Sequence, residues 1–68
     1  MIVENKVLEI LSKHPKEFTS PLFRMTQAKL EGYDVDSFRK MLHVMKDNGL
    51  ITYVPETKYS LPHWEIKR

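Results

Sequence analysis

The segment 35–48 carries side chains that could contact nucleic acid if it forms a helix. The side chains that would reach outward from it are Ser37, Arg39, Lys40 and His43. The guanidinium of Arg39 could donate two hydrogen bonds to the edge of a guanine, and the ammonium of Lys40 could place a charge against a phosphate. Such a face is compatible with a helix that lies in the major groove of DNA.

A second group of this kind lies in the turn-like polar stretch 55–58 and just after it. Lys58, which Tyr53 and Tyr59 flank in the sequence, could contact the DNA backbone or the minor groove together with Tyr59. The alternative is a hairpin whose tyrosines pack across the strands, with an incidental lysine.

Acidic residues give both groups a simpler interpretation. Asp36 and Asp47 share the polar face of the segment 35–48, and Glu56 lies close to Lys58. Phosphates repel such carboxylates unless a cation pairs with them, and an ordinary amphipathic helix also exposes a charged face to water. The residues alone leave both interpretations open.

The element that must position the first group is a helix that runs directly into a strand. At helical spacing the apolar side chains of the segment 35–48 fall within an arc of roughly 120°. They are Val35, Phe38, Met41, Leu42 and Met45. Asn48 and Gly49 tolerate the left-handed backbone that ends a helix. The segment 50–54, which is rich in β-branched and aromatic residues, then predicts a strand.

The chain before this unit predicts two more helices. Apolar residues at helical spacing predict the first over 2–13, and Pro15 ends it. We expect a short extended segment over 16–19, with a buried Phe18. Ser20 as the N-cap and Pro21 at the first helical position predict a second helix over 21–31. Gly32 ends that helix, and Asp34 is the expected N-cap of the third.

The end of the chain predicts a strand that returns along the segment 50–54. Either 59–61 or 63–67 could form it, since Pro62 separates the two. Trp64 and Ile66 would share one face of that strand. They either cover the helical core or form an exposed apolar patch through which the protein binds a second copy or a larger partner.

In order, these elements are helix, short strand, helix, helix, strand, wing and strand. The stretches VLEILSKHPKEFTS and FRKMLHVMKDNGLI carry a resemblance to the winged helix-turn-helix superfamily of DNA-binding domains. Apolar residues lie eleven, seven and four positions before the glycine of a Gly-Leu-Ile step, and they are Phe38, Leu42 and Met45. The resemblance implies one domain over 1–68, mainly α with a small β-hairpin (α+β), whose third helix enters the major groove.

The composition of the chain argues against membrane, metal-binding and enzymatic functions. The chain has 68 residues, a net charge of +2 and no cysteine. It has no apolar run of the roughly 18–20 residues that span a bilayer, and its start lacks the features of a signal peptide. We therefore expect a cytoplasmic protein that does not bind membranes. We interpret His14, His43 and His63 as solvated surface residues rather than metal ligands, and expect no cofactor. No arrangement of nucleophile and base is identifiable, so we expect no enzymatic activity.

The leading functional hypothesis is a small regulator of transcription, of prokaryotic or mobile-element type, that binds double-stranded DNA. The rival is a winged helix that binds only protein, which the near-neutral charge and the aspartates of the third helix favour. Fold class alone does not separate the two, because function depends on the site.

Overall fold

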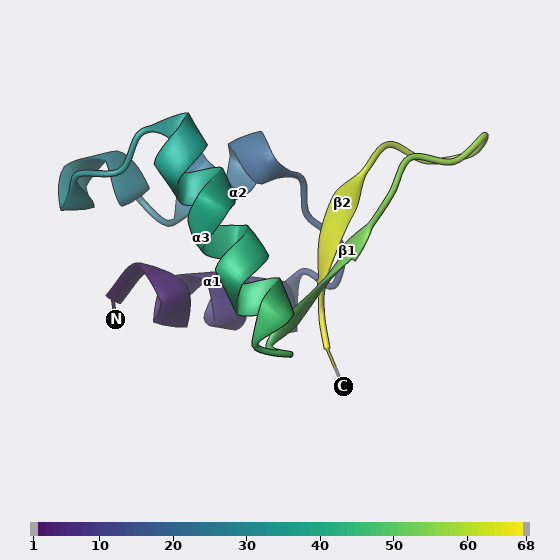
Figure 1. Cartoon of the computed structure of the whole chain (residues 1–68), viewed down its shortest axis with the longest axis horizontal. Coiled ribbons are helices and arrows are strands. Elements are labelled where there is room, and N and C mark those ends of the chain that lie inside the picture. Colours follow the sequence, from purple (N-terminus) through teal and green to yellow (C-terminus); the bar gives the residue numbers. More distant parts are fainter. Residues whose placement is uncertain (1, 68) are drawn as a thin grey trace.

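The structure is a computed structural model that describes residues 2–67. Over this range the chain forms three α-helices, one 3-10 turn and two antiparallel strands (Figure 1). In order they are α1 (Ile2–Lys13), α2 (Thr19–Met25), η1 (Ala28–Glu31), α3 (Val35–Asp47), β1 (Ile51–Val54) and β2 (His63–Ile66). The predicted α+β class is confirmed.

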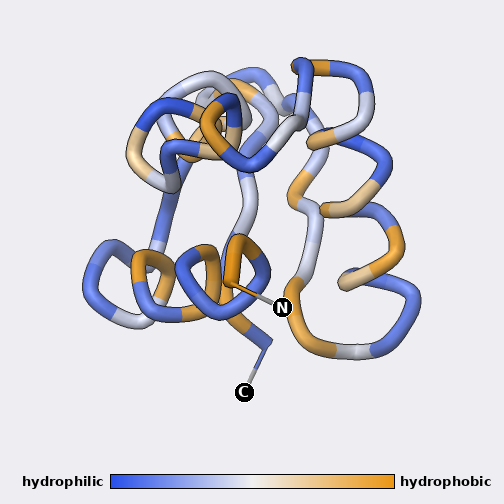
Figure 2. The backbone as a smooth tube through the Cα atoms, turned by 90° about the vertical axis from the view of Figure 1, so that its left-hand side faces the viewer, coloured by the Kyte–Doolittle hydropathy of each residue, from blue (hydrophilic) through white to orange (hydrophobic). Residues whose placement is uncertain are grey.

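Helix α1 has the predicted bounds and buries one side. Val3, Val7 and Leu11 recur every four residues and are the buried residues of the helix. The alternation of hydrophobic and hydrophilic positions along the helices is visible in Figure 2. Glu4 in the first turn and Lys13 in the last complement the helix dipole.

Of the predicted extended segment 16–19, only Glu17 and Phe18 are extended, since Lys16 lies in a bend and Thr19 begins α2, and Phe18 is not buried. Glu17 and Trp64 exchange two backbone hydrogen bonds, of 3.1 and 2.8 Å. Phe18 follows this pair, and its side chain is 43% exposed. Its ring contacts the imidazole of His63 edge-on, with 6.5 Å between the ring centroids. The backbone pairing of Glu17 therefore anchors the segment, and burial of the aromatic ring does not.

The second helix begins earlier and ends sooner than the sequence predicts. Phe18, not Ser20, is the N-cap of α2, and Pro21 is the third helical residue instead of the first. A proline at that place breaks no helical hydrogen bond, because the first intrahelical donor of α2 is the N–H of Leu22, which bonds to the carbonyl of Phe18. The start predicted from Ser20 and Pro21 is thus wrong.

The predicted helix 21–31 is interrupted at Thr26 and Gln27, between α2 and η1. The buried hydroxyl of Thr26 donates to the carbonyl of Leu22 (2.8 Å), and Gln27 adopts the left-handed conformation with φ 54°. The chain then resumes as η1. The break lets Leu22 and Ala28 both point into the core. In one straight helix, these two side chains would point in different directions from the axis.

Helix α3 is the best predicted element. Asp34 caps it through a capping box with Ser37, and Phe38, Met41, Leu42 and Met45 are its buried residues. Val35, which the arc also included, is 42% exposed, since it lies in the first turn, beyond the edge of the core. At the other end Gly49 has φ 78°, and the N–H of Leu50 bonds to the carbonyl of Met45 at 3.0 Å.

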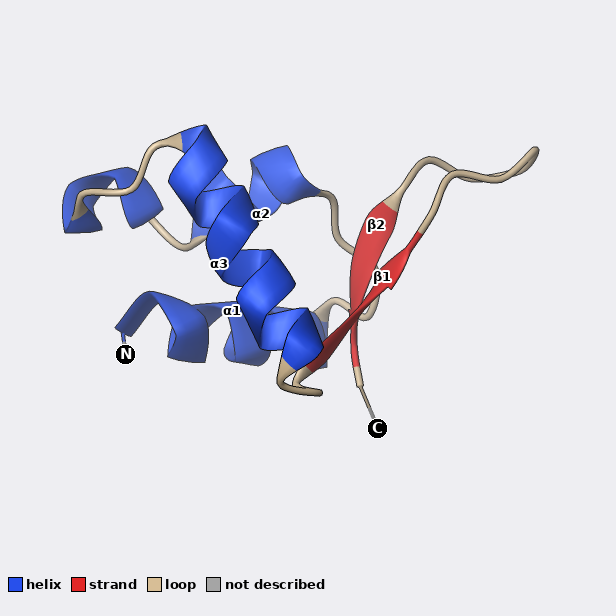
Figure 3. Cartoon of the chain, in the orientation of Figure 1, coloured by secondary structure: helices blue, strands red, loops and turns tan. Residues whose placement is uncertain are grey.

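The two strands form a hairpin that projects from the helices (Figure 3). β2 spans His63–Ile66, so the segment 63–67 is the returning strand and 59–61 is not. Ile51 pairs with Ile66, and Val54 pairs with His63. Glu17 pairs with the opposite edge of β2, which ties the connection after α1 to the hairpin.

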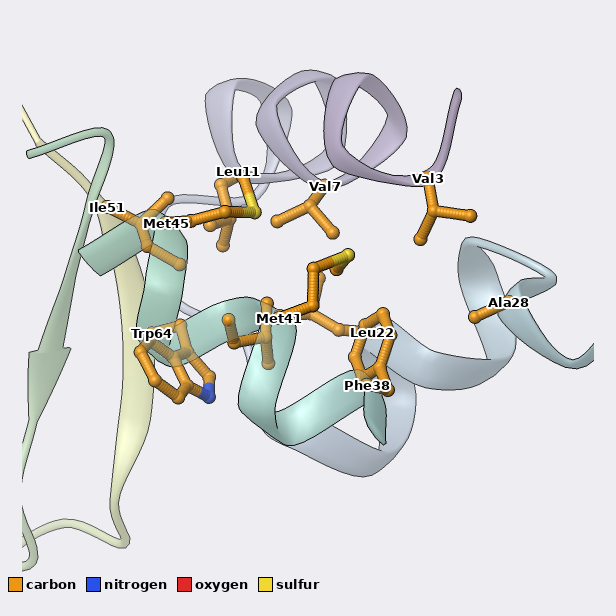
Figure 4. Close-up of a cluster of buried hydrophobic side chains, with 11 residues drawn as sticks. Val3, Val7, Leu11, Leu22, Ala28, Phe38, Met41, Met45, Ile51 and Trp64 are labelled. Carbon is orange, nitrogen blue, oxygen red and sulfur yellow. The ribbon is translucent and has the colours of Figure 1, made fainter. Parts of the chain in front are cut away.

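The core lies between α1, α2, α3 and the base of the hairpin (Figure 4). Phe38, Leu42 and Met45 are buried in one cluster with Val7 and Leu11, and Ile10 is partly buried against it.

Trp64 covers this core, because its side chain is 1% exposed. Its indole N–H donates to the hydroxyl of Thr19 at 2.9 Å, and Ile66 is half-buried against the same cluster. The alternative in which Trp64 and Ile66 form an exposed patch for a partner is therefore wrong.

Candidate nucleic-acid interface

The outward face of α3 presents cations and carboxylates side by side. Arg39 and Lys40 are exposed, as the sequence predicts. Arg39 Nη1 lies 3.8 Å from Asp36 Oδ1, and Lys46 Nζ lies 4.0 Å from Asp47 Oδ1. Ion pairs as exposed as these contribute little to stability, so a phosphate could displace either carboxylate at small cost.

Ser37 takes part in the capping box at the start of α3. Its backbone N–H donates to Asp34 Oδ1 at 2.7 Å, and its hydroxyl accepts from the N–H of Asp34 at 3.0 Å. The hydrogen bond from the Ser37 N–H holds the pKa of Asp34 below its usual value. A contact between Ser37 and DNA would therefore compete with the helix cap, and the ionised Asp34 lies beside it.

His43 connects α3 to the hairpin. Its imidazole lies 5.3 Å from the ring of Trp64 and 6.1 Å from that of Tyr53, between ring centroids. The side chain is half-buried, so the expectation of a fully solvated His43 is wrong. Because Arg39, His43 and Lys46 follow the i, i+4, i+7 spacing, the cations flank His43 along the side of α3 that faces β1.

The loop between the strands is held in a tight turn that exposes its tip. The Thr57 N–H donates to the Ser60 carbonyl at 2.9 Å, and the Thr57 hydroxyl accepts from the N–H of Tyr59 and of Ser60. Between them, Lys58 is exposed and the Tyr59 side chain is 94% exposed. Figure 1 shows this loop extending beyond the helices. The residues predicted for the wing therefore lie at the tip of the hairpin, apart from those of α3.

Sequence reasoning missed Tyr53 as part of this surface. Its ring is 36% exposed, and its centroid lies 4.8 Å from that of Trp64 and 6.1 Å from that of His43. The alternation of the segment 50–54 could have indicated its side of the strand, but only the hairpin register places it beside α3.

His63 departs from the expectation of a surface histidine, because its side chain is 3% exposed. Nδ1 lies 3.0 Å from the carbonyl of Leu61, and Nε2 lies 2.8 Å from Glu65 Oε2. Both ring nitrogens of His63 therefore lie within hydrogen-bond distance of an oxygen. His63 thus anchors one end of the loop instead of facing solvent.

The described residues, 2–67, include no group of three or more potential metal ligands from His, Cys, Asp and Glu. In the same range, no helix is long and apolar enough to cross a membrane.

No protein family, curated protein or solved structure matches this chain.

Proposed function

We propose that this protein binds double-stranded DNA as a small winged helix-turn-helix regulator. Helix α3 would lie in the major groove, and the loop 55–62 would contact the backbone or the minor groove. The order of elements supports the proposal, since a strand-like pairing at Glu17 precedes α2 and a hairpin with a long loop follows α3.

One observation carries the proposal: the outward side of α3 and the hairpin form a single surface. The rings of His43 and Tyr53 lie 6.1 Å apart and bridge the two elements. A duplex laid along Arg39 and Lys40 would therefore also meet the hairpin. Lys58 and Tyr59 at its tip extend the same contact, because the loop projects past the helices (Figure 1).

The charge of this surface sets the expected strength of binding. Each lysine or arginine that neutralises a phosphate contributes about −0.9 to the slope of log K against log salt. Lys40 and Lys58, the two residues proposed to contact phosphates, would together give a slope of about −2. The protein should therefore bind one DNA site weakly, and measurably only at low salt.

Truncation of the cations tests the groove geometry. If Arg39 makes two hydrogen bonds to a guanine, Arg39→Ala should cost about 1–3 kcal/mol and relax the preference at one base position. Lys40→Ala and Lys58→Ala should weaken binding evenly across sequences and flatten the salt slope by about one unit each. Lys13→Ala is the charge control, because Lys13 lies on α1. A loss equal to that of Arg39→Ala would show diffuse attraction and refute the groove model.

The ion pair between Asp36 and Arg39 allows a second test with a matched control. Asp36→Asn removes a carboxylate from the proposed contact and frees Arg39, so it should tighten binding severalfold at low salt. Glu9→Gln makes the same change in net charge and frees Lys13 from a similarly exposed pair of 3.2 Å on α1. Equal tightening by both variants would exclude a contact specific to α3.

A protein-binding module is the second candidate, and the carboxylates of α3 favour it. Asp36 and Asp47 each lie within 4.0 Å of a cation of the same helix, so little unpaired positive charge remains on that face. A mobility-shift titration on mixed-sequence duplex, repeated over a range of salt, separates the two functions. Failure to bind at the lowest salt would exclude DNA as the ligand.

A further inference from the structure

A buried histidine, His63, lies where the loop 55–62 joins β2. Its side chain is 3% exposed, although histidine is the side chain that ordinarily changes charge near neutral pH. Val54 is its register partner on β1, and the ring of Phe18 contacts the imidazole edge-on, with 6.5 Å between the ring centroids. Because both neighbours are apolar, the polar atoms of the ring find their partners among the residues before and after it in the chain.

These partners are two oxygen atoms, one for each ring nitrogen. Nδ1 lies 3.0 Å from the carbonyl oxygen of Leu61, and Nε2 lies 2.8 Å from Glu65 Oε2. Neither a carbonyl nor an ionised carboxylate can donate, and a neutral imidazole has one N–H where the imidazolium has two. The protonated ring can therefore satisfy both oxygens and the neutral ring only one. Since a hydrogen bond to a carboxylate is the stronger of the two, the neutral ring should give up the bond to Leu61.

The bond to Leu61 connects the loop to the sheet. Hydrogen bonds between Thr57 and Ser60 close the tip of the loop, and two arms, 55–56 and 61–62, join this tip to the strands. Within residues 2–67, the contact between the Leu61 carbonyl and Nδ1 of His63 is the one hydrogen bond that either arm makes to a strand. Without this bond the loop is free to move relative to the sheet.

We propose that protonation of His63 fastens the loop 55–62 to the sheet and thereby regulates the contact of this loop with DNA. At lower pH the imidazolium holds both oxygens and the loop is ordered. At higher pH the neutral ring keeps Glu65 and releases Leu61. The fastening of the loop is a property of the free protein, whereas its effect on DNA rests on the function proposed above.

The charges around His63 make Glu65 the carboxylate to replace. In the described part of the chain, Glu65 is the one acid within 4.0 Å of the imidazole. Glu17, which precedes Phe18 in the extended connection, directs its side chain to the opposite face from Phe18. Glu56 lies beyond the paired part of β1 and is exposed.

Nuclear magnetic resonance of the free protein tests the fastening of the loop. Order parameters from ¹³Cα relaxation of Tyr59 and Leu61 should rise as the pH is lowered from about 7.5 to about 5.5, the range in which histidine ordinarily changes charge. The rise should have the same midpoint as the chemical shifts of the His63 ring. Order parameters that stay constant while the His63 ring changes charge would overturn the proposal.

Glu65→Gln separates the switch from a purely structural role of the ring. The new amide can donate to Nε2 while Nδ1–H donates to Leu61, so a neutral ring makes both bonds. The loop of this variant should be ordered already at about pH 7.5 and should lose its response to acid. Glu56→Gln makes the same change in charge at an exposed position of the loop and should keep the wild-type response. Circular dichroism verifies that both variants are folded. Equal responses of the two variants would contradict the switch.

Fluorescence anisotropy with a labelled duplex at low salt tests the effect on DNA. An ordered loop holds Lys58 in place, so Lys58→Ala should weaken binding severalfold more at about pH 5.5 than at about pH 7.5. In the Glu65→Gln background the loss should be the same at both pH values. Equal losses at both pH values in the wild-type background would refute the regulation. Absence of binding at either pH would refute the proposed DNA binding, and relaxation of the free protein would still decide whether His63 fastens the loop.

Discussion

The hydrogen bond between Trp64 and Thr19 should hold the hairpin and the start of α2 together. The indole N–H donates to the Thr19 hydroxyl at 2.9 Å, from a side chain that is 1% exposed. Thr19→Val preserves the shape of the side chain but leaves this N–H without its acceptor. A buried donor left unpaired costs about 1–3 kcal/mol.

That cost is large for so small a domain. A chain of 68 residues has a free energy of unfolding of about 3–10 kcal/mol. Each kcal/mol lowers the melting temperature of a domain of this size by about 4–8 °C. Trp64→Ala, which also empties the space of the indole, should cost about 3–5 kcal/mol and leave much of the protein unfolded.

A double-mutant cycle isolates the hydrogen bond from the loss of packing. Trp64→Phe removes the donor as well as part of the ring, so adding Thr19→Val to it should cost less than Thr19→Val alone, by about 0.5–1.5 kcal/mol. Urea unfolding is followed by circular dichroism, because Trp64 is the one tryptophan of the chain. Thr52→Val, at an exposed position of β1, controls for the exchange of threonine for valine. A coupling energy of zero would refute the role assigned to this hydrogen bond.

Three further predictions concern helix α3. Leu42→Ala should lower the free energy of unfolding by about 2–5 kcal/mol, because Leu42 is fully buried, and an unchanged urea midpoint would contradict the core assignment. Gly49→Ala should cost about 1–2 kcal/mol through the strain of φ 78°, and Gly49→Asn less, as thermal unfolding would show. Because the pKa of Asp34 is lowered in the folded state, its contribution to stability is present above about pH 4 and is lost as the pH falls further. The difference in unfolding free energy between wild type and Asp34→Asn should therefore shrink on acidification from pH 6 to pH 3, and a constant difference would contradict it.

The proposed DNA surface depends on contacts that spacing could not predict. Helical periodicity correctly placed Arg39 and Lys40 on the exposed side of α3. Helical periodicity also predicted an exposed position for His43. In the structure, the hairpin covers that imidazole with Tyr53 and Trp64. A ring that contacts both elements couples their positions, and only the tertiary structure supplies that contact.

Sequence alone determined the elements whose signals are local. The period of apolar residues predicted α1 and α3. Gly49 predicted where α3 ends, because glycine tolerates the left-handed backbone conformation. Asp34 was predicted as a cap because its carboxylate can satisfy free N–H groups of the first turn. Each of these signals depends on residues within one or two helical turns of each other.

Tertiary structure decided the rest, because the deciding contacts join residues far apart in the chain. The pairing of Glu17 with Trp64 positions the start of α2, which Ser20 and Pro21 had predicted two residues too late. The break at Gln27 lets side chains on both sides of it reach one core. The burial of Trp64 follows from the packing of the hairpin against the helices, and the period-two pattern of a strand cannot tell which of its faces will be covered.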